Sequence, residues 1–314
     1  MSKIEENIND VVCELVYDYG KGKTIDEAGI FDHPDKEAII DIISSLRKIV
    51  FPGYFRNRGI KVYTLRNNLS MLIEDVMFKL ARQIAIVIGG DEDNDAEIAE
   101  SSKLITLEFI KRLRKIREYI DADVQAAFDE DPAAFSKDEI IYSYPGLFAT
   151  FVNRIAHELY LLNVPIIPRM MTEYAHSVTG IDIHPGASIG RNFFIDHGTG
   201  IVIGETTEIG DNVKIYQGVT LGALSTRGGQ ALKNKKRHPT IGDNVTIYSG
   251  ASILGGDTFI GKDAVIGGNA FITRSVPDGA KVSVKNQELM YNYKISKPIE
   301  KRDISEDTSW FYII

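Results

Sequence analysis

An aliphatic residue returns every six positions through most of residues 183–273, and this period constrains the fold more than any other feature of the chain. Helical stripes recur near 3.6 residues and strand faces near 2, so the period fits neither a helix nor an ordinary strand. It is typical of a triangular solenoid, in which three short faces make one coil of about eighteen residues and stacked coils bury a continuous core. The repeating positions are Ile183, Ile189, Ile195, Ile201, Ile203, Ile209, Ile215, Leu221, Ile241, Ile247, Ile253, Ile260, Ile266 and Ile272.

Glycine often follows the aliphatic residue of the repeat. We expect these glycines to adopt backbone angles that other residues avoid, as a tight corner requires. They are Gly190, Gly204, Gly210, Gly222, Gly242, Gly261 and Gly267. The period pauses between Leu224 and His238, which predicts a loop over residues 224–239 that leaves the solenoid.

Outside the repeat, helical patterns predominate, so the predicted fold class is α + β. We expect an all-helical N-terminal domain over residues 1–180, a β-helix over 181–278 and a mostly irregular C-terminal tail over 279–314. Helices are predicted over residues 63–88, 96–127, 148–162 and 165–178, with a break at Asp129–Ala134.

Composition and charge exclude several classes of protein. The formal net charge of −8 argues against a nucleic-acid or anionic-membrane surface, which needs a basic face. The single cysteine, Cys13, excludes an internal disulfide. The N-terminus lacks the pattern of a signal peptide, and the longest apolar run, Ile84–Ile88, is too short to cross a bilayer. A cytoplasmic protein that binds neither nucleic acid nor membrane is predicted.

Asp182 and His197 are candidates for acid–base chemistry. They lie fifteen residues apart, close to one coil, so their side chains could meet on stacked coils. A carboxylate that holds an imidazole makes a general base, because it fixes the tautomer and stabilises the imidazolium. The alternative is that both are polar corner residues of the solenoid. A covalent mechanism is not expected, because Cys13 lies in a distant helical segment and no serine sits in a G-x-S-x-G turn.

Two further features surround these residues. His184, His197 and His238 could bind zinc between neighbouring chains, but one belongs to the loop and two neighbour carboxylates, so no metal is expected. The loop also carries a dense basic patch, which either meets phosphates or a substrate carboxylate or is simply solvated. The patch consists of Lys233, Lys235, Lys236 and Arg237.

Four motifs follow one another in the repeat, and together they resemble serine O-acetyltransferases of the hexapeptide-repeat acyltransferase family. The motifs are GIDIHPGASIG at 180–190, DHGTGIVIGET at 196–206, QGVTLG at 217–222 and KRHPTIG at 236–242. The resemblance covers residues 125–278. It implies a left-handed parallel β-helix, homotrimers that often pair into hexamers through the N-terminal helices, and active sites between neighbouring β-helices.

The activity that this resemblance implies is acetyl transfer from acetyl-CoA to the hydroxyl of L-serine, the first step of cysteine biosynthesis, with L-cysteine as feedback inhibitor. His197 matches the general base and Asp182 the carboxylate that orients it. The residues matching those that bind the serine ammonium are Asp131 and Asp196, and those near its carboxylate are Arg237 and His238.

The resemblance also places residues near CoA and at the C-terminus. Small residues match the positions that contact CoA, namely Gly222, Ala223, Ser249 and Gly268. The sequence departs from the family pattern at Ala223, which replaces a glycine, and at 282–287, which replaces a Gly-x-Pro-Ala turn. The terminal Ile314 is expected to enter O-acetylserine sulfhydrylase, although the tail could instead fold back on its own β-helix.

Two alternative functions stay open. The chain could be an acetyltransferase of the same fold with another acceptor, although Asp131, Asp196 and Arg237 favour an amino acid. It could also be a scaffold that docks the sulfhydrylase, although a scaffold has no need of the Asp182 and His197 pair.

Overall fold

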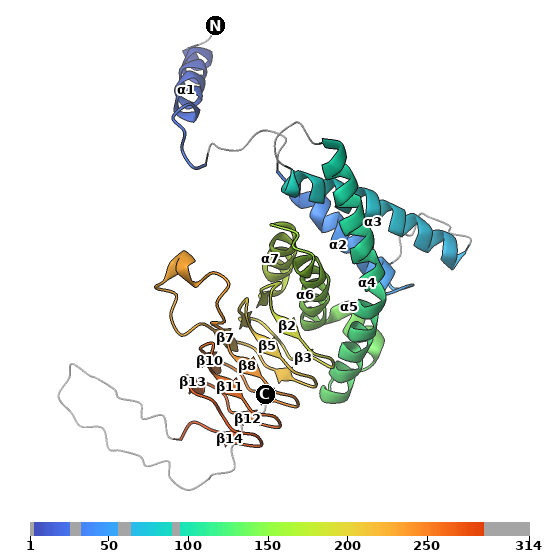
Figure 1. The fold of residues 1–314 in the computed structure, drawn as a ribbon, viewed down its shortest axis with the longest axis vertical. Helices are drawn as coiled ribbons and strands as arrows, with labels where there is room; N and C mark the ends of the chain where they lie inside the picture. Colours follow the sequence, from blue (N-terminus) through green and yellow to red (C-terminus); the bar gives the residue numbers. More distant parts are fainter. Residues whose placement is uncertain (1–2, 26–32, 56–63, 90–94, 286–314) are drawn as a thin grey trace, which may run out of the picture. The chain divides into compact units, whose positions relative to one another are not determined.

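The computed structural model describes residues 3–25, 33–55, 64–89 and 95–285. The chain divides into two compact units, Met1–Lys111 with Leu162–Ile167 and Arg112–Leu161 with Pro168–Ile314. Helices give way to strands between Thr179 and Asp182 (Figure 1). The predicted class, a helical region followed by a parallel β-helix, is confirmed.

The first unit is helical. Its helices are α1 (Lys3–Tyr19), α2 (Lys36–Val50), α3 (Leu65–Ile88) and the first part of α4 (Asp95–Glu130). Asp35 caps α2 by accepting a hydrogen bond from the Glu37 amide, and α2 packs on α3 through buried Leu46 and Leu80. Cys13 is exposed on α1. Among the described residues, no helix is long and apolar enough to span a membrane.

The second unit has helices that the sequence predicted only in part. It contains the rest of α4, then α5 (Lys137–Ser143), α6 (Pro145–Leu161) and α7 (Ile167–Thr179). The predicted break begins two residues too early, because α4 continues to Glu130 and the break starts at Asp131. The short helix α5 was not predicted. Its signal is Ser136, whose hydroxyl accepts a hydrogen bond from the Glu139 amide at 3.2 Å.

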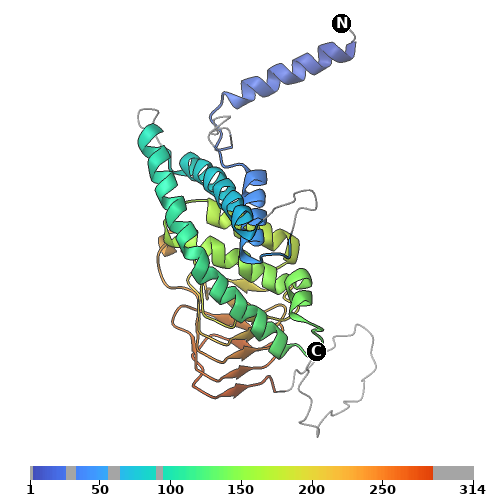
Figure 2. The same cartoon turned by 90° about the vertical axis from the view of Figure 1, so that its right-hand side faces the viewer.

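Three parallel sheets form the faces of the β-helix, whose coils stack one on another (Figure 2). Face A contains β1 (Asp182–Ile183), β4 (Val202–Ile203), β7 (Thr220–Gly222), β10 (Ser252–Leu254) and β13 (Phe271–Ile272). Face B contains β2 (Ser188–Ile189), β5 (Glu208–Ile209), β8 (Thr240–Ile241) and β11 (Phe259–Ile260). Face C contains β3 (Phe194–Ile195), β6 (Lys214–Ile215), β9 (Thr246–Ile247), β12 (Val265–Ile266) and β14 (Lys281–Val282).

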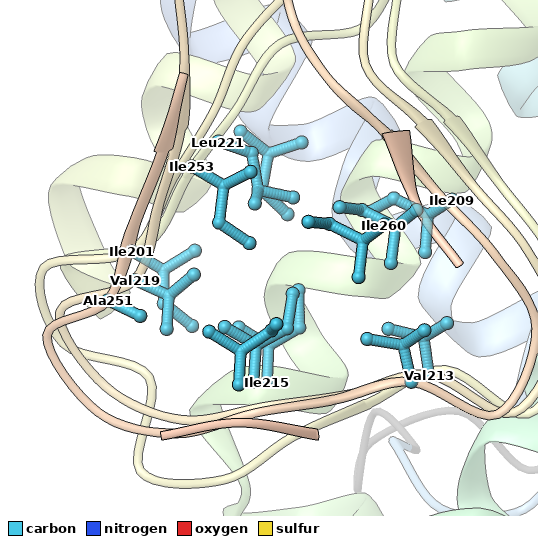
Figure 3. Packing of buried hydrophobic residues seen from close by; sticks show 14 of the residues in the cluster. Ile201, Ile209, Val213, Ile215, Val219, Leu221, Ala251, Ile253 and Ile260 are labelled. Carbon is cyan, nitrogen blue, oxygen red and sulfur yellow. The ribbon is translucent and has the colours of Figure 1, made fainter. Parts of the chain in front are cut away.

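The aliphatic repeat forms the core of the β-helix. On face A, Ile183 pairs with Ile203, and Ile203 pairs with Leu221, so each inward side chain lies on its equivalent in the next coil. Figure 3 shows Leu221, Ile215 and Ile260, one from each face, pointing into the space that the three faces enclose. Ile247 and Ile253 are fully buried. Burial of each such side chain contributes about 1.5–3 kcal/mol, which explains why a six-residue period builds this fold.

The glycines of the repeat are needed for close stacking, and the prediction of unusual backbone angles at these positions is wrong. A Cβ on Gly190 would lie 2.5 Å from the Gly210 carbonyl oxygen, and one on Gly242 would lie 2.9 Å from the Lys262 amide nitrogen. Positive φ angles occur instead at other glycines, which include Gly198, Gly200, Gly218 and Gly250. The glycines of the repeat therefore let consecutive coils approach.

Asparagines occupy left-handed positions at the corner between faces B and C. Asn192, Asn212 and Asn244 have φ of 55°, 57° and 59°. The Asn192 amide donates to the Asn212 side-chain oxygen at 2.7 Å, and the Asn212 amide donates to that of Asn244 at 2.9 Å. This ladder joins successive coils, and asparagine suits it because it tolerates the left-handed region.

The predicted loop leaves the β-helix after β7 and returns at β8. It contains a short 3₁₀ helix, η2 (Gly229–Leu232), which is orange in Figure 1. Strand pairing continues past the expected end of the β-helix at residue 278, because β14 pairs with β12 at Lys281 and Val282. The remainder of the predicted tail, from residue 286 to Ile314, lies outside the described residues.

Candidate active site

One corner of the β-helix carries the predicted general base. We call the residues that join face C to face A the His197 corner; they are 196–201, 216–219, 248–251 and 267–270. Hydrogen bonds join its coils, with the Gly218 amide donating to the Thr199 carbonyl at 3.0 Å and the Gly250 amide donating to that of Gln217 at 2.9 Å. Thr199 is therefore aligned with Gln217 and, on the next coil, with Ser249, and His197 lies two residues before Thr199 on the same corner.

The His197 side chain is held in the open. Its residue has φ of 58°, and its side chain is 55% exposed. Nδ1 lies 3.6 Å from the Asp196 carboxylate, whose side chain is 18% exposed. The next residue, Gly198, has φ of 89°, which other residues rarely adopt, and a Cβ on it would lie 2.9 Å from Cγ2 of Ile195. The corner thus presents an accessible imidazole beside a carboxylate.

Asp182 has a different partner from the one predicted. Its carboxylate accepts a hydrogen bond from Nη1 of Arg169 at 3.3 Å, and Arg169 also pairs with Glu173. The structure shows no hydrogen bond between Asp182 and His197, both of which are described. The Gly200 amide donates to the Gly180 carbonyl at 2.8 Å, so the His197 corner stacks beside the start of β1 without pairing the two side chains. The permanently charged guanidinium competes for the carboxylate.

Asp131 is fixed by two donors at the end of α4. Tyr144 donates its hydroxyl to Oδ2 at 2.5 Å, and the Ala133 amide donates to Oδ1 at 2.8 Å. Burial raises the pKa of Tyr144, and the Asp131 hydrogen bond and the charge of Asp196 raise it further. Tyr144 therefore remains a donor, and Asp131 and Asp196 act on the same hydroxyl. Of these two predicted acids, Asp196 lies beside His197, and Asp131 is linked to it through Tyr144, on which both charges act.

The second polar corner contains His238. We call the residues that join face A to face B the His238 corner; they are 184–187, 204–207, 223–239 and 255–258. The His238 residue is 7% exposed, and its Nδ1 accepts a hydrogen bond from the Thr206 amide at 3.1 Å. Burial lowers the pKa of His238 to about 4, and the positive charge of Arg237 contributes in the same direction. His238 is therefore neutral and carries its proton on Nε2.

Arg237 is held by a carboxylate that the sequence analysis did not assign. Its Nη2 donates to Glu205, and Tyr160 donates to the other Glu205 oxygen at 3.3 Å. Burial opposes ionisation of Glu205, but the hydrogen bond and charge of Arg237, with His184 and Tyr160, together outweigh it, so the pKa of Glu205 is lowered. Nη1 of Arg237 is buried and has no partner among the described residues. This nitrogen therefore has unused donor capacity.

The basic patch of the loop is attached to the coils at its C-terminal end. Lys236 donates to the Thr206 carbonyl at 2.6 Å and pairs with Glu208 at 3.1 Å. Lys233 and Lys235 are exposed. Ion pairs thus hold the charges of Lys236 and Arg237 at the His238 corner, and the choice between a solvated patch and an anion-binding patch stays a prediction.

The three histidines considered for zinc lie at two corners. His184 and His238 belong to the His238 corner, whereas His197 lies at the other. Nδ1 of His184 accepts a hydrogen bond from the Gly186 amide at 3.0 Å, and burial lowers the pKa of His184. One chain therefore does not assemble this set as a metal site.

The residues predicted to contact CoA divide between the corners. Gly222 ends β7 and Ala223 follows it at the His238 corner, while Ser249 and Gly268 lie at the His197 corner. A Cβ on Gly268 would lie 3.2 Å from the Ser249 carbonyl oxygen. With glycine at this position, no side chain projects from the backbone. The two groups are separated by the width of face A.

Comparisons with known proteins agree with this architecture. No family model matches the chain. It is 44% identical over 261 residues to the plasmid serine acetyltransferase of Synechococcus elongatus, a match that spans 80% of this chain and 81% of the relative. It is 42% identical over 186 residues to the serine acetyltransferase of Bacillus subtilis, spanning 59% of this chain and 82% of the relative.

Solved structures show the same likeness. Serine acetyltransferase isoform 3 of Entamoeba histolytica, in complex with cysteine, aligns with a TM-score of 0.69 and 34% identity, covering 90% of this chain and 94% of the other. The Neisseria gonorrhoeae serine acetyltransferase in complex with serine aligns with a TM-score of 0.52 and 27% identity, covering 79% and 97%.

The fold and its two polar corners define a transferase built on a parallel β-helix. Since a relative 44% identical is matched over 81% of its length, the chain belongs to the serine acetyltransferase family.

Proposed function

We propose that this enzyme transfers the acetyl group of acetyl-CoA to the hydroxyl of L-serine and forms O-acetyl-L-serine, the first step of cysteine biosynthesis. The observation that carries the proposal is the accessible imidazole of His197 beside the Asp196 carboxylate, together with Asp131, which binds the Tyr144 hydroxyl whose pKa the charges of both carboxylates raise. An amino-acid acceptor needs anions for its ammonium and a base for its hydroxyl.

The reaction proceeds by direct attack. His197 takes the proton of the serine hydroxyl while its oxygen forms a bond to the thioester carbon. The carbon–sulfur bond then breaks, and the imidazolium returns the proton to the thiolate of CoA. A backbone amide near Gly222 is a candidate to stabilise the oxyanion.

The substrate groups have assigned partners. Asp131 and Asp196 receive the serine ammonium, while Arg237 and His238 receive its carboxylate. For His238 the support is its neutral state, in which Nε2 donates, and for Arg237 it is the unpartnered Nη1. Acetyl-CoA lies against the small residues Gly222, Ala223, Ser249 and Gly268.

Asp182 orients His197 in this proposal, as the family resemblance implies. This role requires the Asp182 carboxylate to exchange Arg169 for an imidazole. An Arg169→Met variant tests it, because release of Asp182 should raise the catalytic rate or leave it unchanged. A large loss would indicate that Arg169 itself is needed.

The proposed active form is a homotrimer, in which the His197 corner of one chain meets the His238 corner of its neighbour. The support is that the residues for the ammonium and those for the carboxylate lie on opposite edges of face A within one chain. Pairing of trimers into hexamers, inhibition by L-cysteine, a cytoplasmic location and docking of O-acetylserine sulfhydrylase on Ile314 remain predictions.

One assay tests the function. The protein is mixed with acetyl-CoA and a panel of amino-acid, amine and sugar acceptors, and free thiol is measured. L-serine should release thiol, and His197→Ala should abolish the release. Release with another acceptor alone would favour a different acetyltransferase, and no release with any acceptor would leave the scaffold alternative.

A further inference from the structure

We propose that Thr206 is a positioning residue that determines specificity for acceptors with a free carboxylate, because it holds Arg237 and His238 in place. This inference rests on the proposed function, in which these two residues bind the carboxylate of the acceptor. Thr206 itself lies behind them and does not touch the substrate.

The Thr206 hydroxyl uses its whole hydrogen-bonding capacity on two neighbouring residues of the loop. Oγ1 accepts hydrogen bonds from the backbone amides of Arg237 at 2.9 Å and His238 at 3.1 Å. It also lies 2.9 Å from Nδ1 of His238. A hydroxyl has two acceptor sites and one proton, so with both acceptor sites occupied it donates to Nδ1.

The Thr206 backbone fixes the same ring independently. Its amide donates to Nδ1 of His238 at 3.1 Å, so Nδ1 cannot carry a proton without two N–H groups meeting. The proton of the neutral imidazole must then be on Nε2. Both the position of the ring and the identity of its donor nitrogen therefore depend on one residue.

Glu205 completes the anchor on the preceding position. It binds Nη2 of Arg237 and is itself held by Tyr160 from α6. With Nη2 occupied, the guanidinium cannot rotate freely, and its remaining Nη1 is fixed. The dipeptide Glu205–Thr206 thus holds both carboxylate ligands of a loop that is otherwise exposed from Leu224 through Ala231.

The effect should appear in recognition of the carboxylate and leave the chemical step intact. His197 and Asp196 lie on the opposite edge of face A, and neither forms a hydrogen bond or ion pair with this anchor, all of whose residues are described. Loss of the Thr206 hydroxyl should therefore raise KM for L-serine and change kcat little. It should affect L-serinamide, which lacks the carboxylate, much less.

The test compares three variants with L-serine and L-serinamide as acceptors. Thr206→Val removes the hydroxyl at constant shape and leaves two amides without an acceptor, so the ratio of kcat/KM for the two acceptors should fall about tenfold or more. Thr206→Ser keeps the hydroxyl and should retain the ratio. Thr207→Val is the matched control, because the buried Thr207 hydroxyl has no partner among the described residues.

Several outcomes would overturn the inference. An equal loss with both acceptors would show that Thr206 has only a structural role, and an unchanged ratio in Thr206→Val would show that it does not hold the carboxylate ligands. If Thr206→Val does not fold, Glu205→Gln tests the second half of the anchor and should also lower the ratio. Failure of the proposed function is distinguishable, because the wild type would then release no thiol with L-serine.

Discussion

Gly204 lies directly against the imidazole of His238: a Cβ built on Gly204 would be 2.0 Å from Cδ2 and 2.2 Å from Nε2 of that ring. No side chain can occupy this position while the ring stays in place. Gly204 directly follows strand β4 on the coil before the loop, so the surface under His238 is bare backbone. The location of the ring is therefore set by the coil and by the loop together.

Gly204→Ala should displace His238 and weaken acceptor binding. Overpacking of this kind typically costs about 1–3 kcal/mol, so we expect the free energy of unfolding to fall by about 1–3 kcal/mol. Because His238 is displaced, we also expect KM for L-serine to rise about tenfold or more. Steady-state kinetics and urea denaturation measure the two effects. Gly20→Ala is a control, because its added methyl group would meet only the Tyr17 carbonyl oxygen at 3.6 Å. An unchanged KM in Gly204→Ala would contradict the role of His238.

The buried histidines should make stability depend on pH. His238 titrates near pH 6.5 when unfolded and near 4 when folded, so the unfolded chain binds more protons between these values. Its contribution to the free energy of unfolding is complete above pH 6.5 and is lost as the pH falls toward 4. The slope for one proton is about 1.4 kcal/mol per pH unit.

Urea denaturation over pH 4–7 measures this slope. His238→Gln should reduce this slope by an amount that corresponds to at most one proton. The slope that remains should come from His157 and His184, whose pKa values burial also lowers. His176→Gln is a control on the solvent-facing part of α7, where the side chain is 42% exposed. A slope that His238→Gln does not alter would show that the ring is not buried as neutral imidazole.

A buried ion pair joins α4 to α6. Asp123 receives hydrogen bonds from Nε of Arg154 at 2.6 Å and Nη2 at 2.8 Å, and from the Phe193 amide at 2.9 Å. Asp123→Asn leaves the buried guanidinium unpaired and should cost about 3–5 kcal/mol of unfolding free energy. Glu118→Gln removes the partner of an exposed Arg114 and should change stability by less than about 1 kcal/mol. If both variants lost a similar amount of unfolding free energy, the prediction that the buried pair contributes more than the exposed pair would be wrong.

Substitution of the inward-facing residue of a β-helix strand should lower stability strongly, whereas substitution of its outward-facing neighbour should have little effect. Ile247 is fully buried in β9, whereas the preceding Thr246 faces outward. Ile247→Ala should lower the free energy of unfolding by about 2–5 kcal/mol, and Thr246→Ala by less than about 1 kcal/mol. Thermal and urea denaturation of the two variants give the comparison. Equal costs would mean that the side chains do not alternate as described.

The β-helix was predictable because its signal is local and repeated. Each coil buries the same positions, so the spacing of Ile183 and its equivalents predicts the fold without any long-range information. The predicted site residues could be placed on corners for the same reason. His197 and Arg237 lie where the period is interrupted or where a polar residue replaces an aliphatic one.

Other features depend on contacts that no period encodes. Arg169 reaches Asp182 from α7, a helix outside the repeat, so the sequence alone offered His197 as the partner. Glu205 and Thr206 end the DHGTGIVIGET motif, yet they contact Arg237 and His238 only because the loop returns to the coil. The exposed apolar side chains of α1, such as Ile4 and Val16, show that a helical stripe predicts a helix and does not predict what covers it.

Strand register is retained across the loop, and this makes the loop replaceable. Lys214 pairs with Thr246 and Glu208 pairs with Thr240, so the coil after the insertion stacks as the coils before it do. Lengthening such a segment costs little closure entropy. A designer could therefore exchange residues 224–235 for another sequence and alter which acceptors the enzyme admits, while the folding of the scaffold stays under the control of the coils alone.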